Sequence, residues 1–275
     1  VGKESDNIFW INVDGQSGSH NSQLQTLTNF APHNINITQN SGSRRGRLQT
    51  TSNLINGRKT FRFDGSNDYH TIDNSGLINL APFVVNKSYF TVIRTGTNVN
   101  GWQTIYKQGG GSRGLAIYIY NGDMYFHAWN NPNDGPEAPW GSGHGPTRYA
   151  RFDNVQPNTN YVVSCLFDKD ATQKLKIYVN GELGARAETG SCGRIYSHGG
   201  AVSVGGVDGG ARYHDDSSTG GRYFNGYLAE LIHFNDAPVN ETRRRIIENY
   251  FSGKYNIPLS SNQVIATVNS NFTII

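Results

Sequence analysis

Residues 61–69 read FRFDGSNDY, and residues 223–234 read YFNGYLAELIHF. In the first stretch polar and aromatic residues alternate up to Asp64-Gly65, which predicts a strand that runs into a turn. The second stretch predicts a late strand, after which a loop and a helix follow. The two stretches bracket a run of short, alternating segments, so together they predict a chain built mainly of β-strands.

Two hairpins are predicted in the middle of the chain, at Asn121-Gly122 and Asn180-Gly181. Asn-Gly readily adopts the positive φ angles that a two-residue type I′ turn needs, and alternating segments flank both pairs. Before the second turn, one face of the strand is apolar, which indicates a half-buried sheet. That face carries Leu175, Ile177 and Val179.

One helix is predicted near the end of the chain, from Glu241 to Tyr255. Asn240 can cap its first turn, and Gly253 can end it. The apolar stripe that we expect to pack on the strands consists of Ile246, Ile247, Tyr250 and Phe251.

The composition fits one β-rich domain. The 275 residues include 33 Gly, 15 Tyr and 13 Phe, as expected for many short strands joined by tight turns. Sandwiches of about 250 residues commonly form a single unit. We therefore predict one domain over residues 1–258 and a β-prone tail or last strand over residues 259–275.

The two quoted stretches, the Asn-Gly hairpins and the closing helix resemble the laminin-G-like domains of the concanavalin A-like lectin and glucanase superfamily. The pattern covers roughly residues 8–258. The resemblance implies an all-β jelly-roll sandwich of two antiparallel sheets with one short C-terminal helix. It implies no single function, because this fold carries lectins, adhesion domains, glycosidases and lyases.

Charge and hydropathy argue against nucleic acid and membrane partners. The net charge is +3, and the two basic clusters, residues 43–47 and 243–245, are each interpreted as a solvated face. No apolar run approaches the roughly 20 residues that span a bilayer, and no signal segment opens the chain. Cys165 and Cys192 could form one disulfide if the chain is exported, and two unpaired thiols are an equal alternative.

The acidic residues do not show a glycosidase pattern. Related jelly rolls use two glutamates closely spaced on one strand. Here no two glutamates have that spacing among Glu4, Glu137, Glu182, Glu188, Glu230, Glu241 and Glu248. Residues of the kinds that a lyase uses are present, namely His127, Tyr125, Tyr118, Arg151 and His144, but their spacing does not match the alginate-lyase strands. We therefore predict a chain that is not an enzyme.

Two polar, aromatic loops are the candidate glycan-binding site. Sugars stack their apolar faces on Trp and Tyr, and their hydroxyls bond to Asn, Asp, His and Arg. Residues 129–144 form one loop of that composition, and residues 206–216 form another. The alternative is that Trp129 and Trp140 only cover the end of a sheet. The candidate residues are Trp129, Asn131, Asp134, Trp140, His144, Arg212, Tyr213 and His214.

A structural calcium ion is the candidate cofactor. Asp64, Asn67 and Asp68 supply oxygen ligands in one tight turn, although turn chemistry alone also favours these residue types. The resemblance implies a calcium site between an early loop and the last strand, which would bring Glu230 to this turn. No His or Cys pair has the spacing of a zinc site.

These observations predict a non-catalytic module that recognises a surface glycan or polysaccharide and is secreted or surface-exposed. A structural coat, fibre or decoration protein is the first alternative, because the N-terminal arm and residues 263–275 could pair with the sheet edges of neighbouring subunits. A polysaccharide lyase or glycoside hydrolase is the second alternative.

Overall fold

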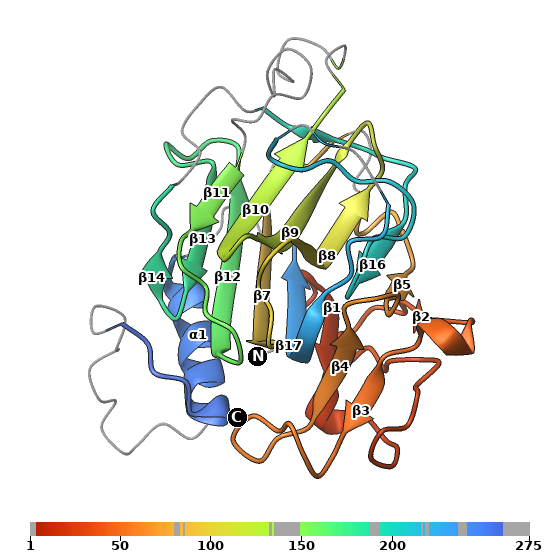
Figure 1. Ribbon diagram of the computed structural model, residues 1–275. Helices are drawn as coiled ribbons and strands as arrows, with labels where there is room; N and C mark the ends of the chain where they lie inside the picture. Colours follow the sequence, from red (N-terminus) through yellow and green to blue (C-terminus); the bar gives the residue numbers. More distant parts are fainter. Residues whose placement is uncertain are drawn as a thin grey trace.

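Two antiparallel sheets face each other, and the helix α1 (Glu241–Tyr255) lies against the outside of one of them (Figure 1). The computed structural model describes residues 4–79, 83–84, 86–131, 134, 149–186, 193–215, 217, 220–235 and 241–260. The predicted fold class is confirmed, since this arrangement is an all-β jelly-roll sandwich with a C-terminal helix.

The larger sheet has eight strands, and β17 (Asn225–Phe234) is at its centre. One edge of β17 pairs with β7, and its other edge is shared: the first half pairs with β4 and the second half with β1. The order across the sheet, apart from β1 (Asn7–Asn12), is β14 (Glu182–Leu183), β13 (Leu175–Val179), β12 (Asn160–Asp168), β7 (Asn86–Thr95), β17, β4 (Thr60–Asp64) and β3 (Arg47–Gln49).

The smaller sheet has seven strands and carries the site described below. Its order is β11 (Tyr149–Phe152), β10 (Asp123–Trp129), β9 (Gly114–Tyr120), β8 (Trp102–Gly109), β16 (Val202–Val204), β5 (His70–Ile72) and β2 (Ile37–Thr38). A separate pair joins β15 (Ile195–Tyr196) to β6 (Phe83–Val84). Two short 3-10 turns, Val13–Gly15 and Gly42–Arg44, lie between the first strands.

Both predicted hairpins are confirmed. Asn121 and Gly122 have φ angles of 49° and 82°, and Tyr120 pairs with Asp123 across the turn. The Asn180-Gly181 turn has φ angles of 49° and 77° and joins β13 to β14. The positive φ values at both central positions are those that the type I′ turn requires.

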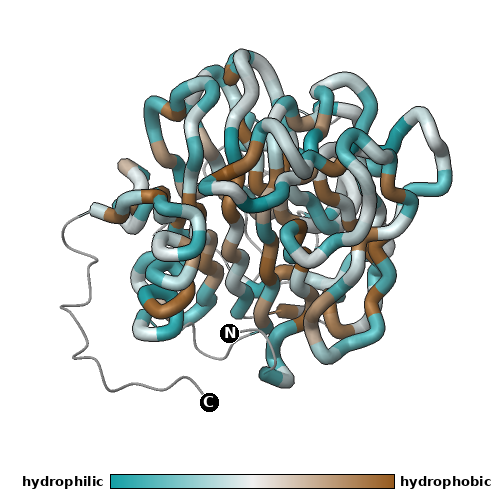
Figure 2. The backbone as a smooth tube through the Cα atoms, turned by 90° about the horizontal axis from the view of Figure 1, so that it is seen from below, coloured by the Kyte–Doolittle hydropathy of each residue, from teal (hydrophilic) through white to brown (hydrophobic). Residues whose placement is uncertain are grey.

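Apolar side chains form three layers. The main core fills the space between the sheets, with Ile117 and Phe126 from the smaller sheet and Phe63 from the larger. A second layer lies between the larger sheet and α1, and a third covers the outer face of the smaller sheet. Figure 2 shows hydrophobic segments gathered in the interior and hydrophilic ones along the outer loops.

The predicted bounds of the helix are confirmed, although Gly253, the predicted end, lies inside it and Asn256, with a φ of 51°, follows its last residue. Two details of its packing also differ from the prediction. Ile246 is exposed, and the buried face is formed instead by residues spaced three or four apart: Arg244, Ile247, Glu248, Phe251 and Tyr255. The interpretation of residues 243–245 as a solvated face was therefore wrong at Arg244. Asn240, the predicted cap, lies outside the described residues.

The end of the described chain packs on the helix layer. Leu259 contacts that layer, and the backbone N–H of Ser260 donates to the carbonyl of Asn180 at 2.8 Å. Residues 261–275, which include most of the predicted tail, lie outside the described residues. Among the described residues, no helix is long and apolar enough to cross a membrane.

Candidate functional site

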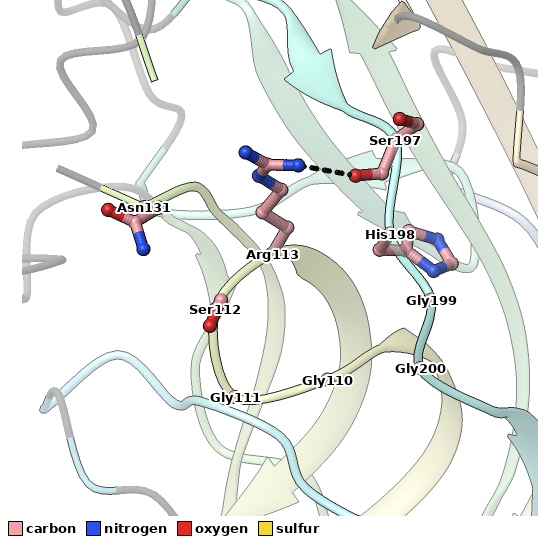
Figure 3. Close-up of a pocket in the computed structure, with 9 residues that line it drawn as sticks. All are labelled: Gly110, Gly111, Ser112, Arg113, Asn131, Ser197, His198, Gly199 and Gly200. Atoms are coloured by element: carbon pink, nitrogen blue, oxygen red, sulfur yellow. Dashed lines mark hydrogen bonds between the residues drawn. The ribbon is translucent and has the colours of Figure 1, made fainter. Parts of the chain in front are cut away.

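A pocket of about 390 Å³ opens where the turn between β8 and β9 faces the loop that leads into β16 (Figure 3). We call these segments the 110–113 turn and the 197–200 loop. Asn131, just after β10, completes the described lining. The pocket is lined by Gly110, Gly111, Ser112, Arg113, Asn131, Ser197, His198, Gly199 and Gly200.

The close approach of the two segments requires glycine. A Cβ atom on Gly200 would lie 2.3 Å from the carbonyl carbon of Gly109 and 2.4 Å from the nitrogen of Gly110. Gly109 itself has a φ of 95°, a conformation that other residues rarely adopt. The wall of the pocket is therefore largely bare backbone, which a ligand can approach closely.

Arg113 is the charged side chain of the 110–113 turn, and its guanidinium is held on two sides. Its Nε donates to Asp134 at 2.7 Å, its Nη2 donates to the other Asp134 oxygen, and its Nη1 donates to the carbonyl of Ser197 at 3.0 Å. The hydrogen bond to Asp134 raises the pKa of Arg113. The Arg113–Asp134 ion pair joins the 110–113 turn to the start of the loop after β10. This connection fixes the position of Asn131 at the rim of the pocket.

His198 forms the opposite wall and connects the pocket to the interior. The amide nitrogen of Gln108 lies 3.0 Å from Nε2 of His198, and the amide oxygen of Gln108 accepts from Tyr89 at 2.6 Å and Tyr106 at 3.2 Å. Gln108 therefore donates to His198, which leaves the imidazole proton on Nδ1. Burial, followed by the nearby charges of Lys87, Lys107 and Arg113, lowers the pKa of His198 to about 4, so the ring is neutral at pH 7.

Four of the predicted glycan-binding residues meet at the 110–113 turn. Asn131 lines the pocket, and Asp134 binds Arg113. Arg212 donates from Nε to the carbonyl of Gly111 at 2.6 Å, and Trp129 donates from Nε1 to the carbonyl of Gly110 at 2.8 Å. Trp129 is fully buried, so it supports the turn and offers no ring face to a sugar in this structure.

The other predicted residues lie elsewhere. Tyr213 is fully buried, with its hydroxyl 3.0 Å from that of Thr104. His214 is half-buried, and its ring stacks on Tyr125 at a centroid distance of 4.1 Å. Both belong to the layer that covers the outer face of the smaller sheet. Trp140 and His144 lie outside the described residues.

Sequence reasoning missed the 110–113 turn and His198. The available signal was a pair of glycine runs, residues 109–111 and 199–200, with Arg113 two positions after the first and His198 directly before the second. Nothing in the sequence shows that these runs, almost 90 residues apart, face each other, because that contact depends on the pairing of β8 with β16.

The structure separates Glu230 from the other predicted calcium ligands, which stay together in one turn. Asp64 accepts from the backbone N–H groups of Ser66 and Asn67 at 2.8 and 3.2 Å, as in an Asx turn. Glu230 lies five residues along β17 from Asn225, the partner of Asp64, so the strand rise places it about 16 Å away. The four-residue site was therefore wrong in including Glu230, and calcium binding by the turn stays a prediction.

Glu230 instead stabilises the contact between β17 and the helix α1. It is fully buried, and its carboxylate accepts from Trp10 Nε1 at 2.7 Å and from the Tyr255 hydroxyl at 2.8 Å. Its ion-pair partner is Lys254 of α1. In the described part of the chain, no three His, Cys, Asp or Glu residues gather as a metal-binding group.

Cys165 is fully buried in β12, and burial raises the pKa of its thiol well above the ordinary value. Cys192 lies outside the described residues. The disulfide between them therefore stays a prediction.

Comparison with known proteins identifies the fold. No family model matches the chain, and no curated protein does. The binding domain of botulinum neurotoxin DC in complex with SialylT matches with a TM-score of 0.55 and 13% identity, over 90% of this chain and 52% of that chain. The same binding domain in complex with rat synaptotagmin II matches with a TM-score of 0.55 and 12% identity, over 89% and 51%.

The binding domain of botulinum neurotoxin serotype D matches with a TM-score of 0.53 and 12% identity, over 92% of this chain and 54% of that chain. This chain thus spans about half the length of these solved structures. At such low identity the likeness shows a shared sandwich fold.

Proposed function

We propose that this chain is a non-catalytic recognition module that binds a glycan in the pocket between the 110–113 turn and the 197–200 loop. The observation that carries the proposal is the lining of the pocket: bare glycine backbone beside Ser112, Asn131 and Arg113. Sugar hydroxyls need several donors and acceptors at short range, and exposed backbone groups supply them without a blocking side chain.

An aromatic ring lies next to these polar groups. The ring centroid of Tyr196, which is half-buried, lies 5.8 Å from Cζ of Arg113. Tyr196 is not among the lining residues, and the guanidinium lies over its ring, so this aromatic residue contributes to the site by supporting Arg113. The fold neighbours support a binding role, since their names describe binding domains, one of them in complex with SialylT. We place the module in a secreted or surface-exposed protein, where such ligands occur.

The test measures retention on immobilised polysaccharides and compares two glycine variants. A Cβ atom on Gly199 or on Gly42 meets no atom within 4 Å, so both positions accept a side chain without a clash. Gly199 lines the pocket, whereas Gly42 lies in a 3-10 turn of the N-terminal region. We expect retention of the wild type and of Gly42→Gln, and loss of retention for Gly199→Gln.

Three outcomes would overturn the proposal. If Gly199→Gln is retained as well as the wild type, the glycan does not bind in this pocket. If no polysaccharide retains the wild type, a protein partner or a structural role is favoured. The same samples are assayed for new reducing or unsaturated ends. Such ends would show that the chain is an enzyme.

A further inference from the structure

The described lining of the pocket contains positive charge and no carboxylate. Arg113 and His198 are the lining residues whose side chains can carry a charge. Asp134, the nearest acid to Arg113, lies behind it: 6% of the Asp134 side chain is exposed, against 36% for Arg113. Asp134 also accepts from the backbone N–H of Asn131 at 2.9 Å, so its oxygens are turned toward protein donors. The opening therefore presents the cation of this pair.

A second cation lies beneath the wall. Nζ of Lys107 is fully buried and donates to two carbonyls, those of Ala201 at 3.0 Å and Asp208 at 2.5 Å. Ala201 follows Gly200 directly, and its carbonyl also accepts from the N–H of Gly109, so Lys107 lies next to the glycine wall. Burial lowers the pKa of Lys107 to about 8, which leaves it mostly protonated at pH 7. The Asp208 carboxylate partly offsets this charge and accepts from Thr71 at 3.0 Å.

Arg113 retains donors for a ligand. A guanidinium has five N–H groups. Three of them donate to Asp134 and Ser197, which leaves one N–H on each Nη nitrogen with no partner among the described residues. These N–H groups can donate to the oxygens of a carboxylate or sulfate ester, and hydrogen bonds between charged partners are stronger than neutral ones.

We infer that the pocket selects acidic glycans, with a carboxylate or sulfate ester of the sugar bound to the guanidinium of Arg113. This inference rests on the proposed function and names the ligand class of the same pocket. The neutral imidazole of His198 and the glycine backbone would then face the uncharged part of the sugar.

The test uses a double substitution that removes the charge and keeps the polar pair. Arg113→Gln alone would leave Asp134 buried without its cation, so we combine it with Asp134→Asn. The matched control is Arg58→Gln with Asp14→Asn, an ion pair of 3.1 Å whose arginine side chain is half exposed and which does not line the pocket. Affinities are measured by calorimetry for a polyuronate, a sulfated polysaccharide and a neutral glucan.

We expect the wild type and the control to bind one of the acidic polymers about tenfold or more tightly than the neutral glucan, with an affinity that falls as salt rises. The Arg113→Gln/Asp134→Asn variant should lose that preference and its salt dependence. The comparison of the polyuronate with the sulfated polymer identifies the anionic group. An anion in the pocket would also raise the pKa of His198, which NMR titration with and without saturating ligand measures.

The inference and the proposed function fail in different ways. If the neutral glucan binds as tightly as the acidic polymers, and Gly199→Gln abolishes both, the pocket binds glycans but does not select for charge. If the double variant keeps the preference for acidic polymers, Arg113 does not bind the anionic group and the inference is wrong. If no polymer binds, both are wrong.

Discussion

Arg244 and Glu248 form an ion pair one turn apart on the buried face of α1, with 2.6 Å between Nη1 and Oε2 and 1% of each side chain exposed. The guanidinium also binds Glu241 and lies 3.8 Å from the ring centroid of Tyr178. Glu248 in turn accepts from the Ser164 hydroxyl at 2.7 Å, which joins the helix to β12 of the larger sheet.

We expect Arg244→Ala to lower the free energy of unfolding by about 3–5 kcal/mol, because it leaves Glu248 buried without its cation. The neighbouring Arg245 is exposed, so Arg245→Ala should change the free energy of unfolding by less than about 0.5 kcal/mol. Urea denaturation of both variants measures the difference. Similar values for the two would show that the buried pair does not stabilise the helix on the sheet.

Glu230→Gln should also destabilise the protein, by about 3 kcal/mol, since it removes the charge that faces Lys254 in a buried site. Glutamine keeps one acceptor oxygen, which can still accept from Tyr255, but its NH2 group then faces the N–H of Trp10 in place of the second carboxylate oxygen. The fold should persist, and the loss should appear as a lower midpoint in urea. Glu182→Gln, on the exposed strand β14, is the control. A calcium role for Glu230 would instead make the loss depend on calcium.

The stability should fall as the pH drops from about 6.5 to 4, in part through His70. Burial lowers the pKa of His70 to about 4, below the value of 6.5 expected in the unfolded chain. In that window the unfolded chain binds the proton and the folded chain does not, so protons favour unfolding. We expect His70→Gln to show a smaller loss between pH 7 and pH 4 than the wild type. His33→Gln, outside the core, should follow the wild-type curve.

The titration of Asp68 should change the stability with pH in the direction opposite to that of His70. Burial, and then the charge of Asp64, raises the pKa of Asp68 to about 6. The folded chain therefore holds this proton more tightly than the unfolded chain, and stability is lost as the pH rises toward 6. Asp68→Asn should stabilise the protein above about pH 6 and have little effect below about pH 4, as followed by Tm.

The same variant tests the predicted calcium site. Calcium bound to Asp64 and Asp68 would relieve their repulsion and raise the Tm of the wild type at pH 7 but not that of Asp68→Asn. Equal Tm values with and without calcium for the wild type would show that the turn binds none.

Local sequence determined the turns and the strands. Asn121-Gly122 and Asn180-Gly181 specify their hairpins because few residue pairs adopt two positive φ angles, and alternation assigns the faces of the strands between them. Residues 241–255 specify the helix. The sequence pattern did not predict which face of that helix is buried. Arg244 is buried because it contacts Glu248, Glu241 and Tyr178 there, and no local pattern records these contacts.

The pocket was decided by tertiary structure. The composition of the loop after β10 pointed to Asn131 and Asp134 as glycan-binding residues, and the structure places both at the 110–113 turn. Trp129 and Tyr213, from the same prediction, are buried. The two glycine runs face each other because of the order of β9, β8 and β16 in the sheet. That order is set by long-range strand pairing, which no local sequence pattern records. The lining thus joins residues 110–113 to residues 197–200 only after the sheet has formed.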